Sequence, residues 1–155
     1  MLTIESMRDE QRCAFAAIWI PWLQGSMKRT AEPEDLAIMA DPASYYRSER
    51  GDAFLAIING EVVGAVAVKK LGPAGFEFCK LIVTEGARGH GVGRALVEHC
   101  LTFAKERDGS AVFLQSFNAL YVALGLYRRM GFVDTPTPAG MSVLARTEII
   151  MMTPV

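Results

Sequence analysis

The pattern of apolar and polar positions predicts a hairpin near the middle of the chain. Two apolar runs, residues 53–58 and 62–68, are separated by Asn59 and Gly60. An Asn-Gly pair between apolar runs favours a tight hairpin turn, because both residue types tolerate a positive φ. A weaker alternation over residues 2–5 predicts an earlier strand.

A central strand is predicted over residues 76–83, after a turn formed by residues 72–75. Successive side chains of a strand point to opposite faces of the sheet. Regular alternation would therefore place four side chains on one face: Glu77, Cys79, Leu81 and Val83.

Helices are predicted where apolar residues recur every three to four positions. Residues 91–107 follow this spacing and carry Arg94 and Glu98 on the outer face, which is typical of an amphipathic helix. Residues 119–130 form the last predicted helix, and Gly131 supplies its end.

Two more helices are expected near the N-terminus. Residues 6–9 have the form of a capping box that opens a helix toward Leu23, with Pro21 distorting or ending it. Pro33 begins a short helix that reaches about Ala40, where Asp41-Pro42 breaks it.

The short apolar run at residues 111–115 is consistent with a buried strand. Because the helix at 91–107 precedes it, this run and the strand at 76–83 predict a strand–helix–strand crossover with parallel strands. A final strand is predicted over residues 142–152, after a turn at 136–140. The order of elements predicts a mixed α/β fold.

Length and charge restrict the class of protein. A chain of 155 residues with 51% hydrophobic residues suits one well-filled core, so we expect a single domain over residues 1–155. The net charge of −1 argues against nucleic acid or an anionic membrane as a partner. The longest apolar run, residues 14–23, is shorter than the ~20 residues of a membrane span, and no signal-peptide pattern precedes it, so we expect a cytoplasmic protein.

The cysteines Cys13, Cys79 and Cys100 include no Cys-x-x-Cys pair, which argues against a disulfide framework or a zinc site. We expect buried thiols and no metal. A catalytic cysteine would need a nearby histidine, and the sequence alone does not place His90 or His99 beside one.

The clearest chemical signal is the run Arg88-Gly89-His90-Gly91-Val92-Gly93 between the central strand and an amphipathic helix. Unpaired N–H groups and the positive end of the dipole make a helix start a site for anions, and glycine allows close approach. The spacing fits neither a P-loop nor the dinucleotide fingerprint, which would require glycine at Arg94. A tight turn alone would not need this many glycines.

With this loop, residues 76–132 resemble the Gcn5-related N-acetyltransferase (GNAT) family of acetyl-coenzyme A-dependent enzymes. The likeness rests on the ordered set of central strand, glycine loop, strand at 111–115 and the run Leu126-Tyr127-Arg128-Arg129-Met130-Gly131-Phe132. It implies a mostly antiparallel twisted sheet, one splayed parallel strand pair and flanking helices.

The resemblance also implies which residues bind acetyl-CoA. In the family, the loop amides hold the pyrophosphate and the central strand pairs with the pantetheine amides. The corresponding positions are Leu81, Ile82, Val83, Arg88, Gly89, His90, Gly91, Val92, Gly93 and Arg94. Many relatives carry a cofactor-binding asparagine where this chain has Leu120; Asn118 or Ser116 could replace it, or the contact could be absent.

The family pattern implies catalytic roles for Glu77 and Tyr127. An amine with a pKa near about 10 is protonated at neutral pH and needs a base. Glu77 could accept that proton directly or through water, or could be only a structural strand residue. Tyr127 would protonate the leaving thiolate, although it could instead be a packed residue of the last helix.

The expected function is therefore acetyl transfer from acetyl-CoA to a primary amine of a small molecule or peptide, by direct attack. Two alternatives stay open: a non-catalytic acyl-CoA-binding sensor, and a transferase of a larger acyl group such as succinyl. The acceptor and a possible homodimer are not fixed by any motif.

Overall fold

The computed structural model describes residues 1–73 and 75–155, and a seven-stranded sheet forms its centre. The strand order is β1-β2-β3-β4-β5-β7-β6. Every neighbouring pair is antiparallel except β4 and β5, which are parallel. The strands are β1 (Leu2–Ser6), β2 (Asp52–Ile58), β3 (Glu61–Leu71), β4 (Gly75–Val83), β5 (Ala111–Ser116), β6 (Val133–Asp134) and β7 (Ile149–Pro154).

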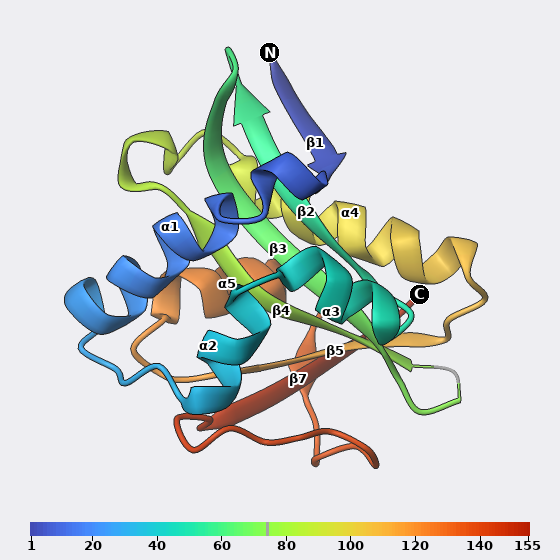
Figure 1. The fold of residues 1–155 in the computed structure, drawn as a ribbon. Coiled ribbons are helices and arrows are strands. Elements are labelled where there is room, and N and C mark those ends of the chain that lie inside the picture. Colours follow the sequence, from blue (N-terminus) through green and yellow to red (C-terminus); the bar gives the residue numbers. More distant parts are fainter. Residues whose placement is uncertain (74) are drawn as a thin grey trace.

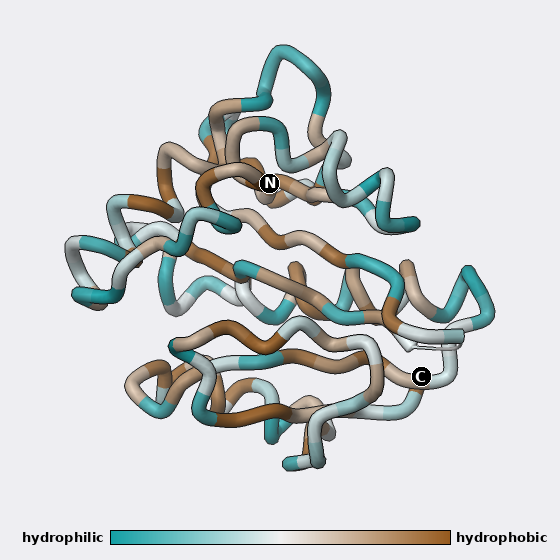
Figure 2. Tube along the Cα trace, turned by 60° about the horizontal axis from the view of Figure 1, so that its bottom comes forward, coloured by the Kyte–Doolittle hydropathy of each residue, from teal (hydrophilic) through white to brown (hydrophobic). Residues whose placement is uncertain are grey.

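Helices cover both faces of this sheet (Figure 1). On one face lie α1 (Ala14–Pro21), α2 (Pro33–Met39) and α3 (Pro42–Ser48), and on the other α4 (Val92–Glu106) and α5 (Tyr121–Arg129). Each face has its own cluster of buried apolar side chains. Figure 2 colours the backbone by hydropathy, and brown, hydrophobic stretches run through the middle of the molecule. The mixed α/β fold predicted from the sequence is confirmed.

The parallel strands β4 and β5 pair over only a short length. Their register joins Gly75 to Ala111, Phe76 to Val112 and Glu77 to Phe113, and no pairing follows. Both strands continue beyond these pairs, to Val83 and Ser116. The sheet therefore opens between them directly after Glu77.

A β-bulge in β4 changes which side chains share a face. Ala65 pairs with Ile82 and Ala67 with Cys79, so β4 carries one extra residue there, and Lys80 takes a φ of 58°. Leu81 and Val83 consequently pack with Phe76 and Phe78 on the α4 side, whereas Cys79 and Ile82 pack on the α1 side. The prediction that Glu77, Cys79, Leu81 and Val83 share one face is wrong, because the bulge reverses the alternation.

The N-terminal segment also departs from the sequence prediction. Ser6 does not cap a helix, because its hydroxyl donates to Asp52 Oδ2 at 2.8 Å. A 3₁₀ turn, η1 (Asp9–Gln11), precedes α1, and after Pro21 the chain continues as a short π-helix, η2 (Trp22–Ser26). The sequence predicts that Pro21 either distorts or ends the helix. In the structure it ends the regular α-helix.

Asp41-Pro42 does end one helix, but it also begins another. Asp41 accepts a hydrogen bond from the Ser44 N–H at 3.4 Å, and Pro42 occupies the first turn of α3, a helix that the sequence analysis missed. The last strand begins at Ile149 rather than at residue 142, and residues 142–147 have no regular structure.

The predicted hairpin turn at Asn59 and Gly60 joins β2 to β3, with φ values of 50° and 77°. Of the predicted turn at 72–75, Ala74 lies outside the described residues. None of the helices formed by residues 1–73 and 75–155 has the length and apolar character needed to cross a membrane.

Candidate active site

Residues 88–93 connect a 3₁₀ turn, η3 (Glu85–Ala87), to the start of α4. Gly89 and Gly91 have φ values of 82° and 78°, and no heavy atom lies within 4 Å of where a Cβ would stand on either. These glycines supply a left-handed backbone and leave the space above the loop open. Gly93 differs, because its Cβ position would lie 3.5 Å from Leu126 and 3.6 Å from Val83, as in ordinary packing.

The loop leads into a helix start, whose first backbone amides have no partner within the helix. The first helical hydrogen bond runs from the Ala95 N–H to the Gly91 carbonyl at 3.1 Å, so the N–H groups just before Ala95 are free of helical partners. Val92 itself is buried, with 1% of its surface exposed. The geometry suits an anion, as the sequence predicts.

The charged side chains near this loop are accessible. Arg88 is exposed, and its Nε donates to the Val83 carbonyl at 3.3 Å. Arg94 forms an exposed ion pair with Glu98 at 3.0 Å, and His90 is exposed as well. Either arginine can turn to an anion at low cost, because exposed contacts of this kind contribute little stability.

A cavity lies where β4 and β5 separate. The two strands line it with Glu77, Phe78, Cys79, Lys80, Leu81, Leu114, Gln115 and Ser116. Further walls come from α1, α2, α5 and the irregular segment after residue 141, through Trp19, Glu34, Asp35, Tyr127, Ser142, Leu144, Arg146 and Thr147.

Glu77 is 2% exposed, and its two carboxylate oxygens differ in their surroundings. Oε2 accepts a hydrogen bond from Gln115 Nε2 at 3.0 Å, whereas Oε1 has no partner among the described residues. Burial raises the pKa of Glu77, against the opposing effects of Gln115 and of the charges on Lys69 and Lys80. A buried carboxyl with a raised pKa and a free oxygen is suited to accept a proton.

Tyr127 projects from α5 toward the same cavity and is 5% exposed. Its ring packs edge-on against Phe78, with 5.4 Å between ring centroids, and lies 5.9 Å from the ring of Phe132. Burial raises the pKa of its hydroxyl above the ordinary value of 10.0. The hydroxyl therefore stays protonated at neutral pH, which is the state that a proton donor needs.

The residues that could replace the family's cofactor-binding asparagine differ in their position relative to the cavity. Asn118 is exposed and does not line the cavity, and its backbone N–H donates to Glu148 Oε1 at 2.9 Å. Ser116, 8% exposed, and Leu120 do line it. Ile82 is buried on the α1 side, so only its backbone can face the opening between the strands.

The cysteines are free thiols, and Cys13 is exposed, so the expectation of buried thiols is wrong for that residue. Burial raises the pKa of Cys79 to about 12 and also raises that of Cys100, which disfavours thiolate chemistry at both. Among residues 1–73 and 75–155, no three His, Cys, Asp or Glu side chains converge to hold a metal ion.

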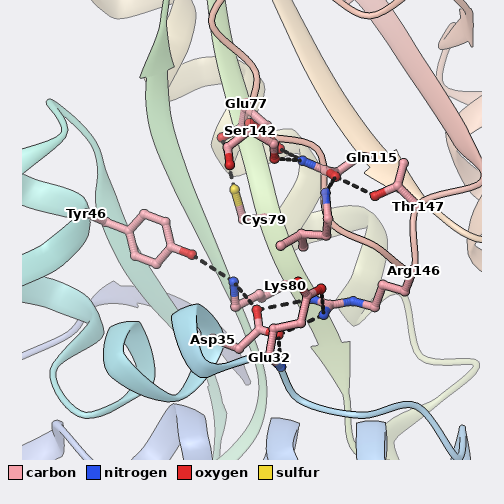
Figure 3. Close-up of polar contacts among 11 residues, drawn as sticks. Glu32, Asp35, Tyr46, Glu77, Cys79, Lys80, Gln115, Ser142, Arg146 and Thr147 are labelled. Atoms are coloured by element: carbon pink, nitrogen blue, oxygen red, sulfur yellow. Dashed lines mark hydrogen bonds and ion pairs between the residues drawn. The ribbon is translucent and has the colours of Figure 1, made fainter.

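Sequence reasoning missed a buried ionic cluster at one end of the cavity (Figure 3). Asp35 is fully buried and accepts hydrogen bonds from Arg146 at 2.7 and 3.2 Å and from the Glu32 N–H at 2.9 Å. Lys80 Nζ lies 3.3 Å from the same carboxylate. Acids such as Glu34 and Asp35 are common in the first turn of a helix, and no local pattern links Asp35 to Arg146, 111 positions away.

Comparison with known proteins decides the family. The model of the acetyltransferase (GNAT) family matches residues 5–132. The chain belongs to this family. Its mixed sheet with a single parallel pair, formed by β4 and β5, is the GNAT fold that the resemblance implied.

Curated relatives are similar over part of their length. The chain is 36% identical over 104 residues to N-acetyltransferase family 8 member 2 of Rattus norvegicus, covering 64% of this chain and 46% of that protein. N-acetylaspartate synthetase of Danio rerio is 33% identical over 112 residues, covering 67% of this chain and 39% of that protein. The chain thus spans less than half the length of these relatives.

Solved structures agree in fold. An acetyltransferase of the GNAT family from Staphylococcus aureus Mu50 superposes with a TM-score of 0.90 at 18% identity, covering 99% of both chains. A ribosomal-protein-alanine N-acetyltransferase from Brucella melitensis gives a TM-score of 0.75 at 18% identity, again covering 99% of both. At these identities the likeness establishes the fold alone.

Proposed function

We propose that the chain is an acetyl-CoA-dependent N-acetyltransferase that acetylates a primary amine by direct attack. One observation carries the proposal: Glu77 and Tyr127 line one cavity where β4 and β5 separate. Glu77 has a carboxylate oxygen without a partner among residues 1–73 and 75–155, and Tyr127 has a protonated hydroxyl. A proton acceptor and a proton donor at one opening are what amine acylation requires.

The residues around this opening fit acetyl-CoA. The open glycine loop at 88–93 and the first turn of α4, including Arg94, would hold the pyrophosphate. Leu81, Ile82 and Val83, which have no strand partner on the β5 side, would pair with the pantetheine amides. When bound, acetyl-CoA supplies the thioester from which the acetyl group is transferred. Asn118 and Ser116 remain candidate contacts.

The chain's own groups would then move two protons. Glu77 Oε1 accepts a proton from the acceptor ammonium, directly or through water, so that the amine becomes nucleophilic. A backbone N–H of β4 stabilises the negative charge that develops on the carbonyl oxygen. The Tyr127 hydroxyl donates its proton to the departing thiolate. The second proton, which the amine nitrogen loses as the amide forms, restores the tyrosine hydroxyl directly or through water.

The acceptor is a small-molecule or peptide amine. Related proteins have names that point to different acceptors. One is N-acetylaspartate synthetase, and another is the streptothricin acetyltransferase of Streptomyces lavendulae. The latter is 44% identical over 50 residues, which cover 32% of this chain and 26% of that protein. The cavity walls carry both signs of charge, through Glu34, Lys69 and Arg146. A cytoplasmic location and a homodimer remain predictions.

A screen of primary amines with detection of free coenzyme A thiol tests the proposal. We expect thiol release that depends on both acetyl-CoA and an amine, with an acetylated product by mass spectrometry. Tight binding of acetyl-CoA without acceptor-dependent release from any amine class would favour the sensor. Faster release from succinyl-CoA than from acetyl-CoA would favour the larger acyl group.

A further inference from the structure

The side chain of Gln115 on β5 uses its full hydrogen-bonding capacity. Its Nε2 donates to Glu77 Oε2 at 3.0 Å and to the Ser142 carbonyl at 2.9 Å. Its Oε1 accepts from the Leu144 N–H at 3.0 Å and from the Thr147 hydroxyl at 2.5 Å. A primary amide offers two N–H donors and two acceptor sites, so no further strong bond is left to it.

Gln115 bridges the opening between the splayed strands. The last β4–β5 pair joins Glu77 to Phe113, and Gln115 lies two positions further along β5. Its amide therefore crosses the gap at the point where backbone pairing stops. It holds one oxygen of Glu77, while Oε1 has no partner in the part of the chain that the structure describes.

The other partners of Gln115 belong to the segment that we name the strap, residues 142–147. The strap has no regular structure, and four of its residues line the cavity: Ser142, Leu144, Arg146 and Thr147. Within the strap, Arg146 donates hydrogen bonds to the buried Asp35 on α2. Gln115 thus joins the carboxyl of Glu77 to a wall of the cavity, as Figure 3 shows.

Several ionisable groups surround the Glu77 carboxyl. Lys69 on β3 and Lys80 on β4 contribute positive charge, and the thiol of Cys79 and the buried hydroxyl of Tyr46 on α3 lie nearby. Burial raises the pKa of Glu77, and the hydrogen bond from Gln115 opposes this more strongly than the charge of either lysine.

We propose that Gln115 is a positioning residue that orients the Glu77 carboxyl and couples it to the strap through one amide. The proposal rests on the proposed function, in which Glu77 Oε1 accepts the proton of the acceptor. Fixing Oε2 restricts rotation of the carboxyl and keeps Oε1 as the oxygen that accepts the proton.

Three variants separate this role from general packing. Gln115→Met keeps the length of the side chain and removes all of its hydrogen bonds. Gln115→Glu keeps the acceptors for Leu144 and Thr147 but, when ionised, loses the donors to Glu77 and Ser142. Thr147→Val is the matched control, because it removes one strap bond and leaves the bond to Glu77 intact.

The readout is the titration of the Glu77 carboxyl by ¹³C NMR in the free protein, with its signal assigned through Glu77→Gln. Both Gln115 variants should titrate at higher pH than the wild type. In Gln115→Met the cause is the lost bond to the charged carboxylate, and in Gln115→Glu a like charge is added to that loss, so Gln115→Met is the decisive variant. Thr147→Val should shift little. At neutral pH, kcat/KM should fall about 10- to 100-fold in the Gln115 variants, as expected for a misplaced catalytic group.

Since the titration needs no substrate, the two proposals can fail separately. A folded Gln115→Met or Gln115→Glu variant in which Glu77 titrates as in the wild type overturns the positioning role. If the titration moves while Glu77→Gln keeps full turnover, Gln115 does position the carboxyl, but Glu77 is not the base. If Glu77→Gln is impaired while the Gln115 variants keep the wild-type titration and kcat/KM, then Glu77 is the base but Gln115 does not position it.

Discussion

Arg146 donates two hydrogen bonds to Asp35, at 2.7 and 3.2 Å, across a separation of 111 positions in the sequence. The side chain of Asp35 is fully buried and that of Arg146 is 13% exposed. With Lys80, which lies 3.3 Å from Asp35, they connect the strap, α2 and β4 around one end of the cavity. Removing one member of such a cluster leaves buried charge uncompensated.

Asp35→Asn should therefore lower the free energy of unfolding by about 3–5 kcal/mol, the usual cost of breaking a buried ion pair. Asp134→Asn is the matched control, because Asp134 pairs with Arg128 at 3.3 Å but is 67% exposed. The control should cost less than about 1 kcal/mol. Urea unfolding of both variants measures the difference, and equal losses would show that the buried cluster adds no special stability.

The difference in stability between the wild type and Asp35→Asn should depend on pH, and the sign of this dependence follows from the pKa of Asp35. Burial acts to raise the pKa of Asp35, but the hydrogen bonds from Arg146 and the Glu32 N–H and the charge of Lys80 outweigh it, so the pKa is lowered. The stabilisation is present above the unfolded-state pKa of about 4 and is lost as the pH falls through the folded-state pKa. The advantage of the wild type over Asp35→Asn should shrink on acidification; a constant difference contradicts this.

Gly91→Val should raise the Kd for coenzyme A, with or without the acetyl group, because the loop is proposed to hold the pyrophosphate. Gly60→Val controls for backbone strain, since Gly60 and Gly91 have φ values of 77° and 78° and open space at the Cβ position. Calorimetry compares the two. Wild-type affinity in a folded Gly91→Val protein would show that residues 88–93 do not bind the cofactor.

Tyr127→Phe should lower kcat by about 10²- to 10⁴-fold with little change in coenzyme A affinity, because the proton is needed only as the carbon–sulfur bond breaks. Tyr46→Phe is the control, since Tyr46 is another buried tyrosine that lines the cavity, with its hydroxyl 3.5 Å from Lys80. It should lose less activity. Steady-state kinetics, together with a melting curve that checks the fold, measures the effect. Full turnover in a stable Tyr127→Phe variant would show that Tyr127 is not the general acid.

The elements with strong local patterns could be predicted from the sequence. The hairpin at Asn59-Gly60, the helix α4 and the crossover to β5 follow from turn chemistry and periodicity, which depend on neighbouring residues alone. The candidate pair Glu77 and Tyr127 came from a family motif, and the structure brings both to one cavity.

Features that depend on distant partners were not predictable in this way. The bulge at Lys80 has no signal in the alternation of β4, because a positive φ at lysine is set by pairing with β3. The strap looked like the start of a strand, but its Leu144 N–H bonds to the Gln115 side chain instead of a neighbouring strand. The cluster of Asp35 and Arg146 forms only when α2 and the strap meet.

The role of Glu77 as the base is tested most directly by the pH dependence of kcat/KM in Glu77→Gln, measured with a responsive amine. Glu34→Gln is the control, because Glu34 lines the same cavity and the substitution removes the same charge. Coenzyme A affinity should be nearly unchanged in both. We expect a large loss in Glu77→Gln at neutral pH that shrinks as the pH rises, since more of the amine is then already neutral. A Glu77→Gln profile parallel to that of the wild type would contradict the assignment and leave Glu77 with a structural role.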